Sequence, residues 1–475
     1  MVRKREIYAM TGIPEEVVAV AFAKTSRSPE SFREIAEGLT AENSSKFHER
    51  WVVGYGHGSV AEHAVLHIAI ENVSRLAVEC VENNRLASYT EKSSRYQVMD
   101  QDAYYTPGKI KKSSHAKIYK ETCNFLFDTY LKVIPAVKAV IEENYPREKG
   151  EDEKSYDGRI RSKYIDVCRF LLPTSLLTNV GMTINARSLE YAITKMLSHQ
   201  LDEVREIGEE VKKVALRVTP TLVKYAEENA YLVETPQHLK KAIGKLDLEV
   251  SSSKESVELV DYDKDGEDKF LATLLYHFSS VSFSTALKTV KRMPRGQKEK
   301  LIEEALGRLL PHDKPIRELE MPYLTFDCLM DWGAYYDLKR NRIMTQLTQD
   351  FTSTYGYAIP KTIELAGVVA EYKDALEKST LAYQKISKEF PEEAKYILTK
   401  AHNKRLLMKM NLRELFYFTK LRGRSNGHFA YRRIAMKIYE LAQAKYPLLL
   451  KYIQFKDYPG SKKLEQEFFE EVIAK

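Results

Sequence analysis

The chain has 475 residues, 44% of them hydrophobic and 30% charged, and a formal net charge of +7 at pH 7. A chain of this length and composition can bury a full core and is too long for one small domain, so we expect a folded protein of two or three domains. The excess of 74 basic over 67 acidic residues is compatible with a phosphate-bearing partner but is too small to favour nucleic acid.

The cysteine spacing fits a reducing compartment, and the hydropathy gives no signal peptide or membrane span. Cys80, Cys123, Cys168 and Cys328 are widely spaced and form no C-x-x-C pair, which argues against a zinc ribbon and a disulfide scaffold. The start, MVRKREIYAMTG, is not followed by the apolar region of a secretory signal. No run approaches the ~18 apolar residues that span a bilayer. We therefore expect a cytoplasmic protein without a membrane partner.

The first predicted strand follows a turn rich in histidine. The segment HAVLHIAIENV, residues 63–73, alternates as a half-buried strand does. In a strand, His63 and His67 lie ~13 Å apart, at ~3.3 Å per residue, which is too far for one zinc ion. We expect no metal site here and interpret His57, in the sequence GHGS, as a loop residue that lies near a ligand ring.

Beyond this strand, the segment ENNRLASYTEKSSRYQ (residues 82–97) contains groups suited to an anionic ligand. Ser93 supplies a hydroxyl group, and Arg95 and the later Arg169 supply guanidinium groups that can each hold two phosphate oxygens. The alternative is that each arginine pairs with a carboxylate such as Glu91 or Glu190, as many surface arginines do.

One long amphipathic helix is predicted in each half of the chain. The segments RSLEYAITKMLSHQLDEVREIGEEVKKVALRV and RELFYFTKLRG…AYRRIAMKIYELAQAKY have helical periodicity with mixed-charge faces, and PYLTFDCLM reads as another strand. The charged, turn-prone stretch at residues 145–159 predicts an insertion, and the polar, Ser-rich stretch at 238–269 contains the best linker candidate.

The two halves have similar segments in the same order. Arg169 and Lys395 each stand sixteen residues before an asparagine, Asn185 or Asn411, that begins an Asn-x-Arg-x-Leu frame. From Arg85 to Asn185 is 100 residues, whereas from Arg342 to Asn411 is 69, so the first half has about 31 extra residues. Several anchors in one order predict an internal duplication, with an α+β fold in each half.

These motifs resemble the flavin-dependent thymidylate synthase family. Its signature is Arg-His-Arg, seven residues, then Ser-x-Arg-Tyr; here residues 83–85 are Asn-Asn-Arg, followed after seven residues by SSRY at 93–96. HGSVAEH resembles the family's His-containing turn, and RFLLP and NARSL resemble two later segments. In the second half, KRNR at 339–342 restores both arginines, but Asp350 and Thr352 stand at the positions of the Ser and the next Arg.

The resemblance implies a fold and an organisation. We expect two tandem domains of α+β class, each with a small, mainly antiparallel sheet and long helices. The first repeat is expected at residues 1–231 with an insertion near 100–160, the linker at 232–256, and the second, more diverged repeat at 257–475. Because the family is homotetrameric, a homodimer of this chain is expected to form a pseudo-tetramer.

The resemblance also implies residue roles. We expect Glu91, Ser93, Arg95 and Arg169 to bind a nucleotide monophosphate, and Arg422, in KLRGRSN, to complete that pocket and stabilise an electron-rich uracil. FAD-binding roles are implied for a larger set: His57, Ser59, Glu62, Arg85, Asn185, Arg187, Arg340, Asn341, Arg342, Asn411 and Arg413.

The implied activity is methylation of dUMP to dTMP with FAD, NADPH and methylenetetrahydrofolate. Two alternatives stay open, because Asn83 and Asn84 replace an Arg and a His of the signature. One is a flavoenzyme that acts on another pyrimidine nucleotide. The other is a noncatalytic relative that binds a nucleotide or a flavin.

Overall fold

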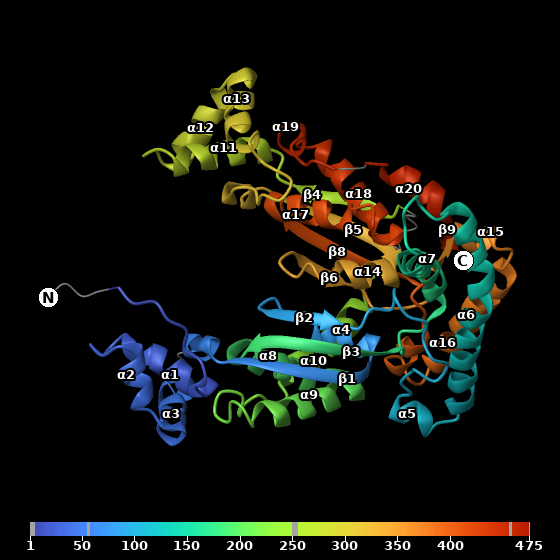
Figure 1. The fold of residues 1–475 in the computed structure, drawn as a ribbon, viewed down its shortest axis with the longest axis horizontal. Coiled ribbons are helices and arrows are strands. Elements are labelled where there is room, and N and C mark those ends of the chain that lie inside the picture. Colours follow the sequence, from blue (N-terminus) through green and yellow to red (C-terminus); the bar gives the residue numbers. More distant parts are fainter. Residues whose placement is uncertain (1–4, 55–57, 249–254, 456–457, 475) are drawn as a thin grey trace. The chain divides into compact units, whose positions relative to one another are not determined.

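The structure is a computed structural model that describes residues 5–54, 58–248, 255–455 and 458–474. It contains two compact units (Figure 1). The first unit comprises Met1–Lys92, Tyr104–Ser113 and Ser175–Val250, and the second comprises Ser93–Ala103, Ser114–Thr174 and Ser251–Lys475. Two segments of the N-terminal half therefore pack with the C-terminal half. The predicted repeats at 1–231 and 257–475 concern sequence order and stay a prediction.

The first unit consists of helices around a three-stranded antiparallel sheet of order β1-β3-β2. Its elements are α1 (Glu15–Thr25), α2 (Phe32–Glu37), α3 (Ala41–His48), η1 (Glu49–Gly54), η2 (Gly58–His63), β1 (Val65–Ser74), α4 (Arg75–Val81), β2 (Ala87–Glu91), α5 (Gly108–Lys111), β3 (Leu177–Asn185), α8 (Ala186–Leu197), α9 (Asp202–Ala215) and α10 (Ala230–Ile243).

The predicted half-buried strand at 63–73 is confirmed as β1, where Leu66, Ile68 and Ile70 are buried and the residues between them face outward. Ser74 ends the strand and caps α4, because its side chain accepts a hydrogen bond from the backbone N–H of Ala77. Asn185 does the same at the start of α8, where it accepts from Ser188. These caps fix where each strand turns into a helix.

The second unit contains a four-stranded antiparallel sheet of order β4-β5-β8-β6 and a β7-β9 pair. Its elements are α6 (Ala116–Asn144), α7 (Glu153–Cys168), η3 (Arg169–Leu171), β4 (Val257–Tyr262), α11 (Gly266–His277), α12 (Phe283–Arg292), α13 (Arg295–Leu306), η4 (Arg317–Glu320), β5 (Tyr323–Asp331), α14 (Trp332–Leu338), β6 (Thr345–Thr348), β7 (Tyr357–Pro360), α15 (Lys361–Leu365), α16 (Val369–Ile386), η5 (Glu393–Ile397), β8 (Asn403–Asn411), α17 (Leu412–Arg422), α18 (Phe429–Gln443), α19 (Pro447–Leu450), α20 (Ser461–Phe468) and β9 (Phe469–Ala474).

Helix α18 lies in the core of the second unit. Its side chains are buried over nearly its whole circumference, and it contacts β4, β5, α14, α17 and α20. A helix that is buried all round must be surrounded by other elements. The loop that leads into α18, with the last turn of α17, is thereby held close to α14.

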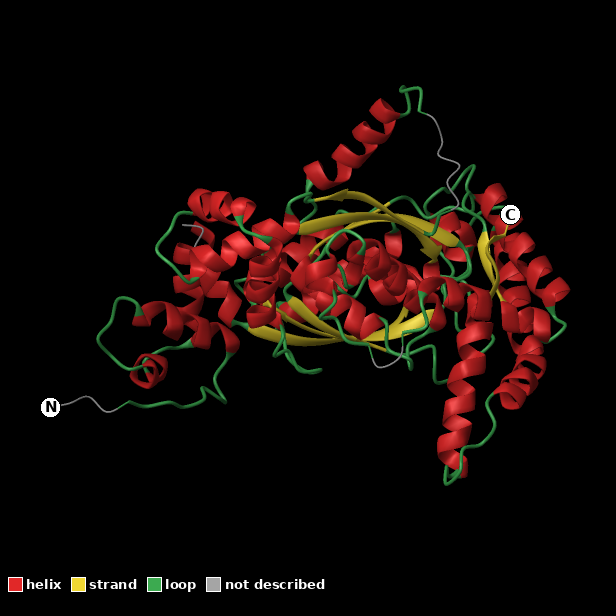
Figure 2. Cartoon of the chain, turned by 90° about the horizontal axis from the view of Figure 1, so that it is seen from above, coloured by secondary structure: helices red, strands yellow, loops and turns green. Residues whose placement is uncertain are grey.

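The central strand pair of the first unit, β1 and β3, resembles that of the second unit, β5 and β8, in its pairing and in the cap that follows. Val65 pairs with Asn185 at one end of β1 and β3, and Tyr323 pairs with Asn411 at the same end of β5 and β8. Asp331 caps α14 by accepting from Ala334, as Ser74 caps α4. The mixed α+β class with small antiparallel sheets is therefore confirmed, and helices form most of the regular structure (Figure 2).

A reciprocal backbone contact joins two segments within the second unit. Thr174 donates to the carbonyl of Leu398 at 2.8 Å, and Lys400 donates to the carbonyl of Leu172 at 3.0 Å. These bonds flank a bridge between Pro173 and Thr399. Helices α6 and α16, which precede the two segments, also pack on each other (Figure 1). The two bonds are reciprocal, as contacts in an isologous interface are.

The stretches predicted as an insertion and a linker are more helical than their composition suggests. The stretch at residues 145–159 follows the end of α6 at Asn144, and within it α7 already starts at Glu153 and packs along α6. Of the predicted linker, residues up to Ile243 belong to α10, and 249–254 lie outside the described residues. Helix α10 has no buried residue, and this absence of packing is why its composition resembled a linker.

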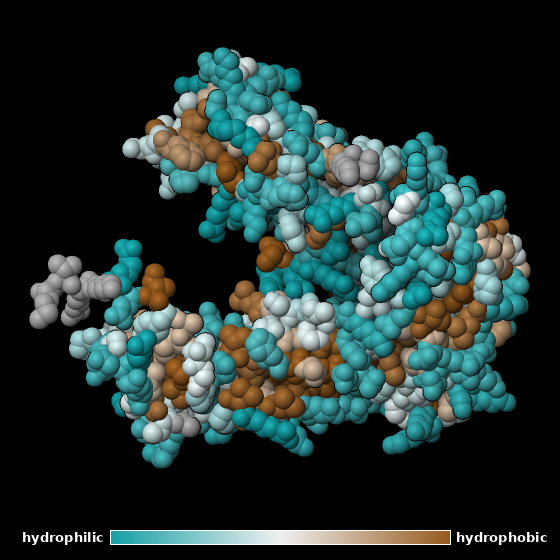
Figure 3. Space-filling view, viewed as in Figure 1, coloured by the Kyte–Doolittle hydropathy of each residue, from teal (hydrophilic) through white to brown (hydrophobic). Residues whose placement is uncertain are grey.

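In the described ranges, no helix is both long enough and apolar enough to cross a bilayer. Some large apolar side chains are exposed, among them Phe278 and Val281 between α11 and α12, where hydrophobic residues gather on the surface in Figure 3.

Candidate functional site: an arginine cluster in the second unit

The tightest charge pair of the cluster joins Arg95 to Asp166. The guanidinium Nε and Nη2 atoms donate to the two carboxylate oxygens at 2.7 and 2.6 Å. Both side chains are largely buried. Burial opposes the charge of Arg95, but its bonds to Asp166 outweigh that and place the guanidinium pKa above its usual value. Asp166 stands near the end of α7, so this helix supplies the partner of a predicted site arginine.

Arg169 lies three residues after Asp166 and reaches a second set of partners. Its Nη1 donates to Ser94 Oγ at 3.4 Å, and its Nη2 donates to Asp337 Oδ2 at the same distance. Ser94 Oγ also accepts a hydrogen bond from Lys400 Nζ at 2.8 Å. Ser94, Arg169 and Lys400 are all buried. One hydroxyl oxygen therefore receives two cationic donors from distant parts of the chain.

Asp337 lies among three guanidinium groups. Besides Arg169, it faces Arg340, whose Nη1 lies 3.8 Å from Asp337 Oδ1. The charges of Arg169, Arg340 and Arg422 together overcome the effect of burial and hold the carboxyl pKa well below its usual range. Asp337 is therefore ionised at neutral pH, although its side chain is mostly covered.

Arg422, at the end of α17, is held by an amide and an aromatic ring. Its Nε and Nη2 donate to Asn341 Oδ1 at 3.2 and 2.9 Å, and its guanidinium carbon lies 5.5 Å from the centre of the Tyr431 ring. Burial lowers the pKa of this arginine. Asn341 is 5% exposed, and its Nδ2 has no hydrogen-bond partner among the described residues. A buried donor of this kind fits an acceptor on a ligand.

The cluster gathers basic side chains around two carboxylates, Asp166 and Asp337. The basic residues are Arg95, Arg169, Arg340, Lys400 and Arg422. Guanidinium groups brought together in this way can hold the oxygens of an anion such as a phosphate.

His428 is uncharged and bonds to the backbone of Asp166 in the cluster. Its Nε2 donates to the backbone carbonyl of Asp166 at 3.0 Å, and its Nδ1 accepts from the N–H of Ala430. Burial, together with nearby Arg169, lowers the pKa of His428 to about 3, and burial lowers that of His402 to about 3 as well. Both rings are uncharged in the folded protein above that pH.

These histidines predict acid lability. The unfolded chain binds a proton at each ring near pH 6.5, whereas the folded chain does not until about pH 3. Their contribution to stability is therefore complete above about pH 6.5 and is lost as the pH falls, by ~1.4 kcal/mol per pH unit for each ring. Urea unfolding at pH 7.5, 6 and 5 measures this slope. His428→Gln should flatten it, and the same change at exposed His238 should not; equal slopes in all three proteins would contradict the assignment.

The predicted substrate residues divide between the units. Arg95 and Arg169 come together with Arg422 in the second unit, and Ser93 stands beside them in sequence, where its Oγ accepts from the N–H of Arg95. Glu91 belongs to the first unit, where its carboxylate is bonded to Arg75 at 2.7 Å and both side chains are almost fully buried.

The predicted cofactor residues of the first unit surround the start of α8. Arg187 pairs with Glu62 across the η2 turn that also contains Ser59, and both charged side chains are substantially exposed. Asn185 is the helix cap described above, and Arg85 lies in the turn before β2. His57 lies outside the described residues.

The predicted cofactor residues of the second unit follow the same pattern. Arg413 donates to Glu320 at 2.6 Å and to the carbonyl of Pro315, and Asn411 caps α17 through the N–H of Glu414. Arg340 and Asn341 take part in the arginine cluster, and half-buried Arg342 follows them before β6. None of these placements by itself assigns a cofactor.

Sequence reasoning missed the acidic members of the cluster. Asp166 and Asp337 each stand three residues before a predicted arginine, Arg169 and Arg340, and this spacing is a recognisable signal for a pair on one helical turn. Lys400 offered no such signal. It comes close to Ser94 only because its backbone bonds to Leu172.

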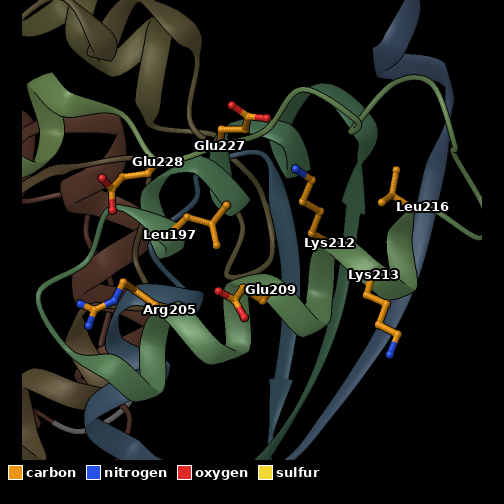
Figure 4. A pocket seen from close by; sticks show the side chains of 8 residues that line it. All are labelled: Leu197, Arg205, Glu209, Lys212, Lys213, Leu216, Glu227 and Glu228. Atoms are coloured by element: carbon orange, nitrogen blue, oxygen red, sulfur yellow. The ribbon is translucent and has the colours of Figure 1, made fainter.

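A separate groove in the first unit has mixed charge. It has a volume of about 600 Å³ and lies against α9 and the end of α8, and Figure 4 shows its lining: Leu197, Arg205, Glu209, Lys212, Lys213, Leu216, Glu227 and Glu228. Lys212 is already bonded to the carbonyl of Ala226. No predicted site residue lines this groove. Elsewhere in the described ranges, no group of three or more His, Cys, Asp or Glu residues is arranged to hold a metal ion.

Some known proteins are similar to this chain over nearly its whole length. A "UPF0159 protein" from Chlamydia muridarum is 32% identical over 487 residues, which cover 95% of this chain and 92% of that protein. A "Flavin-dependent thymidylate synthase" from Clostridium tetani is 30% identical over 225 residues, which cover 47% of this chain and 86% of that protein.

Among solved structures, a UMP/dUMP methylase, PolB, from Streptomyces cacaoi, bound with 5-Br dUMP, aligns with a TM-score of 0.33 and 17% identity. The alignment covers 41% of this chain and 93% of that chain. The model of the family described as "Thymidylate synthase complementing protein" matches residues 6–221 and 258–448 of this chain. The chain therefore belongs to the thymidylate synthase complementing protein family.

Proposed function

We propose that this chain is a flavin-dependent thymidylate synthase-like enzyme that binds dUMP at the arginine cluster and methylates it to dTMP. The observation that carries the proposal is the meeting of Arg95 and Arg169, from the N-terminal half, with Arg422, from the C-terminal half, around buried carboxylates. A site of this kind needs both halves of the chain. This is what we expect of a tandem protein whose two repeats contribute residues to one pocket.

The charge of the cluster supports a nucleotide monophosphate as ligand. Guanidinium groups hold phosphate oxygens through paired, charge-assisted hydrogen bonds. Arg422, which lies beside the Tyr431 ring, is suited to face the base instead. A cation near a uracil carbonyl oxygen stabilises negative charge as it develops there during attack by the ring carbon.

A tandem duplication underlies this proposal. The reciprocal bonds of Thr174 and Lys400 relate counterpart residues, and the ion pair of Arg187 with Glu62 has a counterpart in Arg413 with Glu320. Such correspondence supports one fold used twice. A homodimer would then present four repeats, the number in the family's homotetramer.

Flavin binding is proposed for the second repeat. Asn341 offers an unsatisfied buried donor, and Arg340 and Arg342 flank it. A flavin held there would supply the carbon-transfer and hydride steps, with NADPH and methylenetetrahydrofolate as cosubstrates. In the first repeat, by contrast, the Asn84 side chain is buried and donates to the carbonyl of Val81 and to Tyr89 Oη. It is thereby committed to the fold.

The commitment of Asn84 favours a second candidate function, that of a noncatalytic nucleotide-binding relative. Purified protein separates the two. We expect a yellow protein whose flavin spectrum changes on addition of dUMP, and formation of dTMP when NADPH and methylenetetrahydrofolate are supplied. A colourless protein that binds dUMP but does not take up FAD would replace the enzyme by the noncatalytic relative. Turnover of a different pyrimidine nucleotide would reassign the substrate.

A further inference from the structure

Arg422 is held by a neutral oxygen, whereas Arg95 is held by a carboxylate. Its Nε and Nη2 both donate to Asn341 Oδ1, at 3.2 and 2.9 Å. Among the described residues Arg422 forms no ion pair, and Asp337 acts on it only through its charge at longer range. Arg95, by contrast, donates to both oxygens of Asp166. Arg422 is thus fixed in position by a group that does not neutralise it.

The chemistry of the contact decides which end of the Asn341 amide faces Arg422. A guanidinium group can only donate hydrogen bonds, so the facing atom is the amide oxygen. The backbone of Asn341 is held as well: its N–H donates to the carbonyl of Leu338 at 3.0 Å, and its carbonyl accepts from Gln346 Nε2 at 2.9 Å. With 5% of its surface exposed, Asn341 is a preformed acceptor for Arg422.

The other groups that act on Arg422 leave it charged. The charged and titratable groups near it are Asp337, Arg340, Tyr417 and Tyr431. Asp337 is shared, because it also faces Arg169 and Arg340. The ring of Tyr431, 5.5 Å from the guanidinium carbon, attracts a cation without removing its charge. The positive charge of Arg422 is therefore available to a ligand.

We propose that Asn341 is a positioning residue, which aims Arg422 at the pyrimidine base and leaves the charge of that arginine free to stabilise the base in its N3-ionised form. The proposal rests on the nucleotide-binding function given above. An aspartate in place of Asn341 would also hold Arg422, but its charge would oppose negative charge on the base. A neutral oxygen supplies the orientation alone, and a preoriented cation stabilises negative charge without rearranging.

The substitution Asn341→Asp tests this role, because it keeps an oxygen beside Arg422 and adds a negative charge. The probe is 5-fluoro-dUMP, in which fluorine makes the N3 proton more acidic and the ¹⁹F NMR signal reports whether that proton has passed to solvent. A pH titration of the bound and the free probe compares their N3 pKa values. Binding to the unchanged protein should lower the pKa by about one pH unit, a tenfold change expected of one partly screened unit charge.

The variants should then differ in this signal. In Asn341→Asp the N3 pKa of the bound probe should return to that of the free probe, whereas Asn341→Gln, which keeps a neutral amide oxygen, should retain the lowering. Calorimetric titration establishes that each protein is saturated with the probe, and circular dichroism establishes that it is folded.

Three results would overturn the inference while the proposed function stands. In the first, the probe binds to the unchanged protein but ionises there at the same pH as in solution, a result that needs no variant. In the second, Asn341→Asp retains the full lowering. In the third, the Asp and Gln variants both lose it, so that shape and not charge at residue 341 matters. If the unchanged protein binds neither dUMP nor 5-fluoro-dUMP, the proposed function itself falls.

Discussion

Replacing Arg75 by methionine should lower the free energy of unfolding by ~3–5 kcal/mol, because it leaves the Glu91 carboxylate buried without its counter-charge. The pair bonds at 2.7 Å, and the two side chains are 2% and 1% exposed. Arg75 also donates to the backbone carbonyl of Lys92, so it connects α4 to the end of β2. Urea unfolding followed by circular dichroism measures the loss.

A double substitution separates burial from pairing. Arg75→Met combined with Glu91→Leu removes both charges and should recover most of the loss, because replacing a buried ion pair by apolar side chains is often nearly neutral. The matched control is Arg187→Met, which breaks the exposed pair with Glu62 and should cost no more than ~1 kcal/mol. If Glu91→Gln instead left stability unchanged and abolished dUMP binding, Glu91 would be a ligand-binding residue rather than a structural one.

Several elements could be predicted from the sequence because their signals are local. The alternation in residues 63–73 corresponds to β1, and the predicted strand PYLTFDCLM corresponds to β5. The helical periodicity after the two Asn-x-Arg-x-Leu frames corresponds to α8 and α17. Ser74 and Asp331 cap the next helices through side chains whose types favour that position. Local chemistry decides such boundaries wherever the chain is folded.

The partners within the arginine cluster could not be predicted in the same way. Arg95 and Arg169 were expected to face a ligand, with Glu91 beside them or as a surface partner. The structure gives both arginines Asp166 as a neighbour and gives Glu91 to Arg75. Which carboxylate reaches which arginine depends on how residues 93–103 and 114–174 pack with the C-terminal half. The local sequence signals the i,i+3 pair of Asp166 and Arg169 but not the pairing of Arg95 with Asp166.

The same limit applies to helices α10 and α7. Exposed polar sequence predicts a linker or a turn, but a helix of 14 or 16 residues forms from it when propensity and capping suffice. Asp152 caps α7 by accepting from Ser155, a signal that was present within the turn-prone stretch at residues 145–159. Capping residues therefore carried information that composition alone did not.

Substituting Arg422 by alanine should reduce dUMP affinity by about 10- to 100-fold, which corresponds to the ~1.5–3 kcal/mol of one hydrogen bond to a charged group. The fold should be little affected, because Arg422 bonds only to the amide oxygen of Asn341 among its described hydrogen-bond partners. Fluorescence or calorimetric titration with dUMP measures the affinity, and thermal unfolding measures the stability.

Two further variants test whether both halves of the chain contribute to one pocket. Arg424→Ala, at an exposed position two residues further on, should leave binding unchanged, so a general loss of positive charge is separated from a specific contact. Arg95→Ala should weaken binding at least as much as Arg422→Ala and should also destabilise the protein, since it leaves Asp166 without its closest partner. If Arg422→Ala binds dUMP as well as the unchanged protein while Arg95→Ala does not, the nucleotide is held by the N-terminal half alone, and the shared pocket must be abandoned.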